Sequence, residues 1–169
     1  PIQLDRKLPP VLACGGGLKS TICLTRDKDA FLSQHIGDLD NPKVYEFYTS
    51  TIDHMKKILG INPILVAHDL HPGYYSTDYA ASLEGKNVTC VGVQHHHAHL
   101  ASCLAEHGEE GAAIGVIFDG IGYGADGHLW GGEFLVGDLS SYERVGHFRY
   151  QPMPGGDLAT KQPWRMALS

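Results

Sequence analysis

Residues 94–99, with the sequence QHHHAH, restrict the possible folds of this chain more than any other segment. An apolar run typical of a strand precedes them at residues 88–93, and an apolar-periodic run typical of a helix follows at residues 100–106. On a helix that starts here, His95 and His99 lie on the same face, about 6 Å apart along the axis. Two imidazoles at this spacing can bind one metal ion, as in the HExxH motif of zinc enzymes. The glutamate that acts as the base in that motif is missing, which argues against a protease.

The histidines also have a simpler interpretation. Imidazoles near the start of a helix cap the helix, stack on other rings or stay solvated, and we expect one of these roles for His96, His97 and His107. For His95 and His99, stabilising the fold or docking a partner protein is the alternative to binding a metal.

Asp119 favours the metal. It follows the apolar run at residues 114–118 and precedes a glycine-rich segment at residues 120–127. If this strand lies beside the strand before the histidines, their carboxyl ends meet at the crevice where open α/β sheets bind ligands. The predicted metal ligands are therefore His95, His99 and Asp119, with coordination positions left open for water or substrate.

Composition and charge exclude several classes of protein. The formal net charge is −6 and no run of lysine and arginine occurs, so we expect no nucleic-acid partner. No segment approaches the roughly 20 apolar residues of a membrane helix, and the first residues lack a signal-peptide core, so we expect a soluble, cytoplasmic protein. The four cysteines lack CxxC spacing, which favours buried reduced thiols. Because the chain ends inside a helix-like run, we expect it to be a piece of a longer protein.

The order of elements indicates the fold class. Residues 11–13, 21–24 and 30–34 form short strand-like runs, and a helix follows from the N-cap Asn41 through Pro42 to Gly60. A strand at residues 64–67, a helix at residues 76–83 capped by Ser76, a strand at residues 88–93 and the histidine-led helix complete the order βββαβαβα. Three further strands are predicted at residues 113–118, 129–136 and 143–150.

The last three strands repeat the start of this order. Such a repeated order is found in the two-lobed, RNase H-like α/β architecture of actin, Hsp70 and sugar kinases. We therefore expect a first lobe at residues 1–110 that carries the histidine pair. Residues 111–169 then form the truncated start of a second lobe, with its own glycine-rich hairpin.

In that architecture, glycine-rich hairpins hold the phosphates of a nucleotide between the lobes, because backbone amides can approach closely where side chains are missing. The candidate residues for binding ATP or an adenylate are Gly15, Gly16, Gly17, Lys19, Gly120 and Gly122. The first segment is not a Walker loop, since Leu18 precedes the lysine, and an ordinary hairpin turn is the alternative there.

A polar segment at residues 68–74 follows the strand at residues 64–67, again at the carboxyl edge of the predicted sheet. Asp69 and His71 are its candidate catalytic residues. An Asx-type turn before a helix, with Pro72 and Gly73 as turn residues, is the alternative interpretation.

The motifs together are specific enough to identify a family. They cover nearly the whole chain and lie at residues 12–19, 33–39, 68–72, 94–99, 118–120, 130–134, 154–157 and 163–167. The chain resembles the C-terminal carbamoyltransferase domain of the HypF family of hydrogenase maturation proteins. Antibiotic O-carbamoyltransferases and the tRNA threonylcarbamoyl transferase share the domain and its spaced histidine pair.

The resemblance implies an enzyme that hydrolyses carbamoyl phosphate, makes carbamoyl adenylate with ATP and passes the carbamoyl group to the C-terminal cysteine of a HypE-type partner. That group becomes a cyanide ligand of [NiFe]-hydrogenase. In such proteins iron or zinc is held by residues that correspond here to His95, His99 and Asp119. Asp69 and His71 are then the candidates for the base that deprotonates the thiol.

Other parts of a full-length HypF are missing here, so we expect this piece to be inactive by itself and to depend on the missing domains for carbamoyl phosphate and ATP. The alternatives are a related O-carbamoyltransferase, a noncatalytic metal-binding or partner-docking fragment, and a sugar kinase-like ATPase. We expect this chain to bind neither a membrane nor a nucleic acid.

Overall fold

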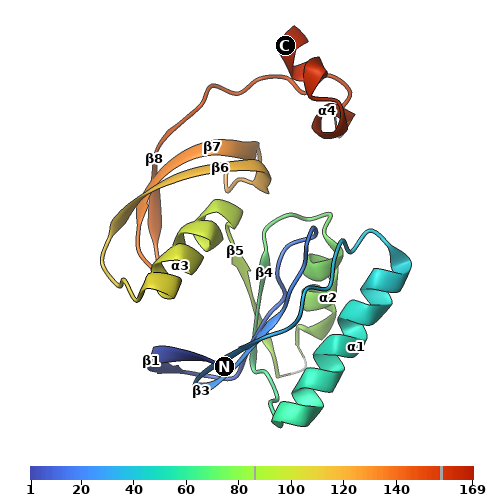
Figure 1. The fold of residues 1–169 in the computed structure, drawn as a ribbon, viewed down its shortest axis with the longest axis vertical. Coiled ribbons are helices and arrows are strands. Elements are labelled where there is room, and N and C mark those ends of the chain that lie inside the picture. Colours follow the sequence, from blue (N-terminus) through green and yellow to red (C-terminus); the bar gives the residue numbers. More distant parts are fainter. Residues whose placement is uncertain (86, 157) are drawn as a thin grey trace.

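The protein is described by a computed structural model that covers residues 1–85, 87–156 and 158–169 (Figure 1). Asp157, in the motif at residues 154–157, lies outside the described residues. The strands are β1 (Ile2–Leu8), β2 (Val11–Ala13), β3 (Cys23–Leu32), β4 (Leu65–Asp69), β5 (Thr89–Val93), β6 (Ala113–Tyr123), β7 (Leu129–Gly137) and β8 (Tyr142–His147). The helices are α1 (Pro42–Leu59), α2 (Tyr75–Leu83), α3 (His95–His107), the short α4 (Leu158–Lys161) and the 3-10 helix η1 (Pro163–Leu168). The order matches the predicted βββαβαβα followed by three strands, although the first three strands are not the predicted ones.

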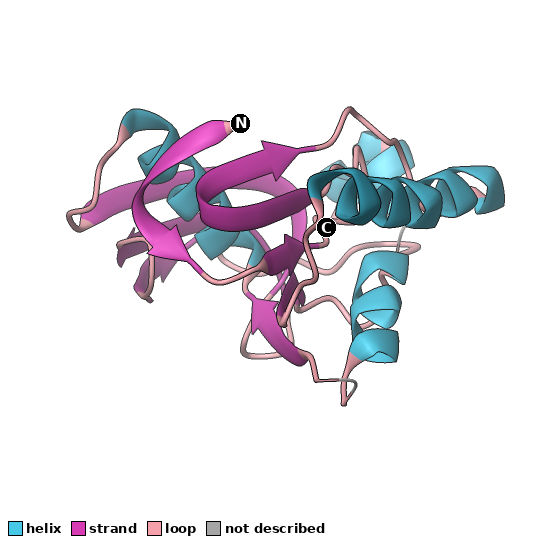
Figure 2. Cartoon of the chain, turned by 90° about the horizontal axis from the view of Figure 1, so that it is seen from below, coloured by secondary structure: helices cyan, strands magenta, loops and turns pink. Residues whose placement is uncertain are grey.

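A mixed five-stranded sheet forms the first part of the molecule, with the strand order β1-β3-β2-β4-β5. The strand β2 pairs antiparallel with β3 and parallel with β4, and β4 pairs parallel with β5. Helices α1 and α2 lie on one side of this sheet, whereas α3 lies on the other side, toward the second sheet (Figures 1 and 2). The main core is buried between the sheet and the first two helices, and it includes Leu12, Ile52 and Val66.

Helix α1 begins and ends where the sequence predicts. The side chain of Asn41 accepts a hydrogen bond from Lys43 N at 3.0 Å, and Pro42 occupies the first turn. At the other end, Gly60 takes the left-handed conformation with a φ of 64°, which favours glycine. Helix α2 differs from its prediction, because Ser76 is buried inside the helix and the N-cap is Tyr74, which makes no side-chain capping bond.

The first three strands differ from the predicted meander. The strand β1 was not predicted, and the runs at residues 21–24 and 30–34 belong largely to one continuous strand, β3. The charged residues 26–29 between these runs form a largely exposed stretch of β3 that pairs with β1. An exposed antiparallel pair has no buried face, so its charges leave no alternating pattern to detect.

A separate three-stranded antiparallel sheet, with the order β6-β7-β8, follows α3. The expectation that the Asp119 strand lies beside β5 is wrong, because β6 pairs with β7 in this second sheet. Asp119 lies within β6 and not at its end, since residues 120–123 continue the strand after a register shift between Phe118 and Gly122. The glycine-rich turn is correspondingly shorter than predicted.

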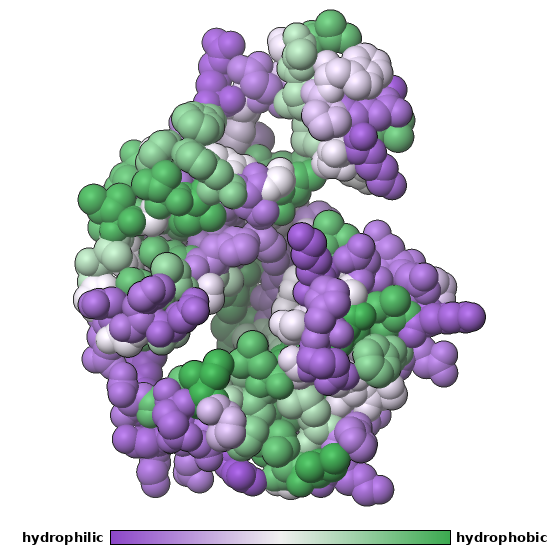
Figure 3. Space-filling view, in the orientation of Figure 1, coloured by the Kyte–Doolittle hydropathy of each residue, from purple (hydrophilic) through white to green (hydrophobic). Residues whose placement is uncertain are grey.

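One face of the second sheet packs on α3 through a small core that includes Leu100, Trp130 and Leu135. The opposite face carries exposed apolar side chains, which appear as green atoms over these strands (Figure 3). The exposed residues are Ile114, Val116, Phe118, Val136, Val145 and Phe148. None of the helices among the described residues is long and apolar enough to span a membrane.

Candidate metal centre

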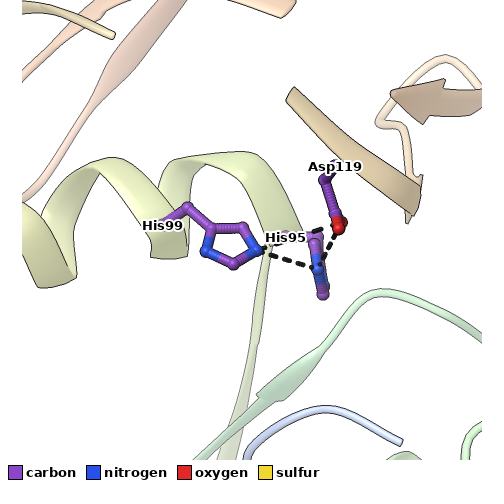
Figure 4. A group of neighbouring side chains, drawn as sticks. All are labelled: His95, His99 and Asp119. Carbon is purple, nitrogen blue, oxygen red and sulfur yellow. Dashed lines mark hydrogen bonds and ion pairs between the residues drawn. The ribbon is translucent and has the colours of Figure 1, made fainter. Parts of the chain in front are cut away.

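The first turn of α3 presents the two predicted histidine ligands on one face. Gln94 is the N-cap, and its side-chain oxygen accepts a hydrogen bond from His97 N at 2.9 Å. The helix therefore starts at His95, and one turn later His99 lies beside it, with 3.2 Å between the two Nε2 atoms (Figure 4). The His95 side chain is 20% exposed and the His99 side chain 52%, so the pair lies at the rim of the site.

Asp119 reaches this pair from the second sheet. Its Oδ2 atom lies 2.9 Å from His95 Nε2 and 3.9 Å from His99 Nε2 (Figure 4). One ligand atom from each of the three residues lies within 4.8 Å of the others. The approach depends on Gly122, because a Cβ atom there would lie 2.5 Å from His96 Cε1. The three predicted metal ligands thus converge, although by packing of β6 on α3 and not by pairing of neighbouring strands.

Asp69 makes a contact that the sequence did not predict. It is the last residue of β4, is 8% exposed, and its Oδ2 atom lies 2.6 Å from His95 Nδ1. Its Oδ1 atom accepts a hydrogen bond from His71 N at 2.8 Å. Both carboxylate oxygens are therefore engaged, and His95 lies between two carboxylates.

The charges of these groups support one another. Contact with Asp119, and then with Asp69, raises the pKa of His95 to about 9 against the opposing effect of burial. The pKa of Asp119 is lowered, first by His95 and also by the hydrogen bond from Gly120 N. Burial, and then the neighbouring charge of His95, lowers the pKa of His96. A cation bound by the cluster would take the place of the His95 Nε2 proton, since metal ligands must be deprotonated.

The donor set suits a divalent transition metal. Two imidazole nitrogens and one carboxylate oxygen are ligands that zinc and iron both accept, and three protein ligands leave positions for water or substrate. Asp119 Oδ2 is buried, and no described group donates a hydrogen bond to it in good geometry. A buried carboxylate oxygen needs a compensating positive charge, which either the protonated His95 Nε2 at 2.9 Å or a bound cation can supply. These residues therefore fit the metal that the sequence predicts.

The other predicted site residues lie around this cluster. The ring of His71 stacks on Tyr74 at 4.1 Å between centroids, and its Nδ1 accepts a hydrogen bond from Gly73 N. Because Nδ1 is an acceptor, the neutral ring carries its proton on Nε2. His71 is consequently arranged as a hydrogen-bond donor and not as a ready base.

The glycines have different roles. Gly15 has a φ of 69°, and a Cβ atom there would lie 2.3 Å from Thr21 O, while one at Gly17 would touch the ring of Tyr74. Gly17, like Gly122, therefore needs glycine for packing, and Gly15 needs it for both packing and its left-handed backbone conformation. A Cβ atom at Gly16 would lie 3.9 Å from His95 Cε1, so Gly16 borders the metal cluster, and Gly120 has open space around it. Lys19 is exposed, and its backbone N–H donates to Asp38 Oδ1.

The neighbouring histidines have structural roles, as expected. His96 is fully buried with its ring 6.0 Å from that of Trp130, and His97 Nε2 contacts Asp138 O at 2.9 Å. His107 Nδ1 contacts the carbonyl of Cys103. Sequence reasoning missed Gln94, although a polar residue between a strand and a helix is a typical signal for an N-cap.

Comparison with known proteins identifies relatives along the whole chain. The family model for the HypF Kae1-like domain matches residues 6–106, and that for the second subdomain of the carbamoyltransferase Kae1-like domain matches residues 115–169. Carbamoyltransferase HypF2 of Cupriavidus necator is 52% identical over 99% of this chain and 21% of its own length. Carbamoyltransferase HypF of Rhizobium leguminosarum bv. viciae is 44% identical over 100% of this chain and 22% of its own length.

Two solved structures share the fold. The crystal structure of full-length HypF in its phosphate- and nucleotide-bound form matches with a TM-score of 0.95 and 49% identity, over 99% of this chain and 22% of that one. The structure of T. kodakarensis HypF matches with a TM-score of 0.86 and 37% identity, over 95% and 21% of the two chains. The predicted fold class is thereby confirmed, and the chain spans about a fifth of the length of these relatives.

Proposed function

Because this chain belongs to the HypF Kae1-like domain family, we propose that it is the part of a carbamoyltransferase in which the carbamoyl group is finally transferred. The donor is carbamoyl adenylate, made from carbamoyl phosphate and ATP by other parts of the protein. The acceptor is the C-terminal cysteine thiol of a HypE-type protein in [NiFe]-hydrogenase maturation, where the group becomes a cyanide ligand. The observation that carries this proposal is the convergence of His95, His99 and Asp119 within 4.8 Å.

The proposed metal is zinc or iron, held by Nε2 of both histidines and by the Asp119 carboxylate. Once bound, such an ion polarises a carbonyl and attracts phosphate oxygens, which favours attack on the carbamoyl carbon. The residues provide one negative charge to a doubly charged ion. The remaining positive charge suits an anionic adenylate at the open coordination positions.

The nucleotide phosphate belongs, in this proposal, beside Gly16 and Gly120, because these glycines border the cluster or have open space. Gly15, Gly17, Gly122 and Lys19 would support the two segments more than contact the phosphate. Of the two proposed catalytic residues, Asp69 already accepts a hydrogen bond at each carboxylate oxygen, and the free ring nitrogen of His71 offers an N–H and not a lone pair. His71 is the better candidate to contact substrate, as a donor.

The first experiment measures metal content in chain purified without a histidine tag. We expect one zinc or iron per chain by elemental analysis, and loss of that metal in His95→Ala, His99→Ala and Asp119→Ala. His107→Ala is the matched control, because His107 is an exposed histidine on the same helix. Wild-type chain that takes up no metal after incubation with Zn²⁺ or Fe²⁺ would contradict the proposal.

The second experiment measures transfer in a hybrid, in which these 169 residues replace the matching fifth of the Cupriavidus necator relative. We expect carbamoylation of a C-terminal cysteine peptide, lost with His95→Ala and kept with His107→Ala. Transfer to a hydroxyl acceptor instead would favour an O-carbamoyltransferase. Phosphorylation of a sugar without metal bound by histidine would favour the kinase alternative.

A further inference from the structure

The most constrained carboxylate near the candidate metal centre is not one of its ligands. Asp69 is 8% exposed and ends β4, which is an interior strand paired on both sides, with β2 and with β5. Its carbonyl oxygen also accepts a hydrogen bond from Thr77 Oγ1 at 3.1 Å, which ties it to α2. The backbone of Asp69 therefore has little freedom to move.

The side chain of Asp69 is held as firmly as its backbone. Oδ1 accepts the hydrogen bond from His71 N at 2.8 Å, which fixes the plane of the carboxylate. Oδ2 is then directed at His95 Nδ1, 2.6 Å away. A carboxylate oxygen can only accept here, so Nδ1 must carry a proton.

We propose that Asp69 is a positioning residue, which fixes the ring of His95 with Nδ1–H toward itself and Nε2 toward His99 and Asp119. This inference rests on the proposed function, because it assigns a residue that orients a ligand of the same proposed metal centre. Asp69 does not touch the metal or the substrate in this assignment.

Ring orientation decides whether His95 can be a ligand. Rotating the imidazole by half a turn about its Cβ–Cγ bond would exchange Nε2 with Cε1, and a carbon atom would then face Asp119. The hydrogen bond from Nδ1–H to Asp69 disfavours that rotation. A carboxylate that accepts a hydrogen bond from Nδ1–H also makes Nε2 a better electron donor to a metal. Metal-bound histidines usually have such an acceptor at their other ring nitrogen.

The inference also explains why a buried carboxylate is tolerated at this point. Asp69 brings a negative charge into a nearly closed position, which is costly without a partner. The imidazole N–H and the backbone N–H of His71 satisfy one oxygen each. Because each Asp69 oxygen already accepts one hydrogen bond and the side chain is nearly closed to solvent, we assign Asp69 a positioning role in place of the base role that the sequence suggested.

The variant Asp69→Asn tests this assignment. Asparagine keeps the size of the side chain and its oxygen can still accept from His71 N, but its amide group offers N–H where His95 also offers N–H. We expect zinc affinity, measured by competition with a chromophoric chelator, to fall about 10- to 100-fold. Asp53→Asn, an exposed aspartate on α1, is the matched control and should bind zinc like the wild type.

A second measurement can be made on the metal-free protein. Histidine ¹⁵N–¹H correlation spectra of wild-type chain should show a protonated His95 Nδ1 whose proton exchanges slowly with water, with and without Zn²⁺. In Asp69→Asn that slow exchange should be lost, while circular dichroism and melting temperature of the metal-free protein stay close to those of the wild type.

The outcomes separate this inference from the proposed function. Equal zinc affinity in Asp69→Asn and wild type, or a rapidly exchanging Nδ1 proton in wild type, overturns the inference while leaving the metal centre intact. Wild-type chain that binds no zinc overturns the proposed function. In that case the metal-free spectrum alone decides whether Asp69 orients His95.

Discussion

The two sheets of this molecule are stabilised in different ways. The five-stranded sheet and its helices α1 and α2 bury a broad apolar core, in which Leu12, Tyr48 and Val66 are at most 1% exposed. The three-stranded sheet has a small core against α3, and much of its other face is exposed. Burial of apolar area can account for the first part, since it is the dominant favourable contribution to folding. The second part needs another source of order.

That source is a network of charged and aromatic groups around Arg144. Its guanidinium lies 2.6 Å from the buried Glu133 carboxylate and 3.2 Å from that of Asp126. It also lies 4.0 Å from the centre of the Trp130 ring. Tyr150 OH donates to Asp126 Oδ2 and accepts from Arg144 Nη1. Asp119, the candidate ligand from the second sheet, therefore lies in the part of the molecule with the smaller apolar core, whereas Asp69 lies in the part with the larger one.

The largest expected effect comes from Arg144→Met. It leaves the Glu133 carboxylate, which is 2% exposed, without its charged partner, and breaking one side of a buried pair costs about 3 to 5 kcal/mol. We expect hydrogen exchange to accelerate in β6–β8 while the five-stranded sheet keeps its protection. Arg149→Met, an exposed arginine on the same segment, is the control. Equal acceleration in both sheets would show that they unfold as one unit.

The sequence predicts the structure of the first part of the molecule better than it predicts the position of the second sheet. Helix α1 was predictable because its signals are local, namely the Asn41 cap, Pro42 and Gly60. The relation of His95 to His99 was predictable as well, because a helix fixes it. The position of Asp119 relative to them was predicted for the wrong reason, since no local pattern reports how one sheet packs on a helix from another. The role of Asp69 required knowing which atom its oxygens meet.

An intermediate effect is expected in the first sheet from Tyr48→Phe. The fully buried hydroxyl of Tyr48 donates to Cys14 O at 3.0 Å, and removing it leaves a buried carbonyl with one partner fewer. We expect a loss of about 1 to 3 kcal/mol in the free energy of unfolding by urea. Tyr45→Phe, one turn earlier and less buried, should change it much less. Equal losses would mean that the buried hydrogen bond of Tyr48 contributes no more than the hydroxyl of Tyr45.

The smallest expected effect is the loss of stability of the second sheet in acid. Partial burial works against ionisation of Asp126, but hydrogen bonds from His128 N, Trp130 and Tyr150 outweigh it and lower its pKa from 3.8 to about 2. A lowered pKa in the folded state stabilises the protein above pH 3.8, and this contribution disappears as the pH falls toward 2.

Because the Asp126 side chain is 39% exposed, screening limits this contribution to less than about 1 kcal/mol. Thermal melts between pH 5 and pH 2 of wild type and Asp126→Asn should therefore converge at the acid end. A constant difference at every pH would assign the stabilisation to hydrogen bonds that do not depend on charge.

Helix α3 has a further consequence for how this chain can change. His95 and His99 face the candidate metal centre, while Leu100 and Leu104 fill the core of the second sheet. An insertion or deletion of one residue between the two histidines would turn the rest of the helix by about 100° about its axis. Such a change would displace His99, a candidate metal ligand, together with two core side chains. The number of residues in this segment therefore fixes the candidate metal centre and the core of the second sheet at the same time.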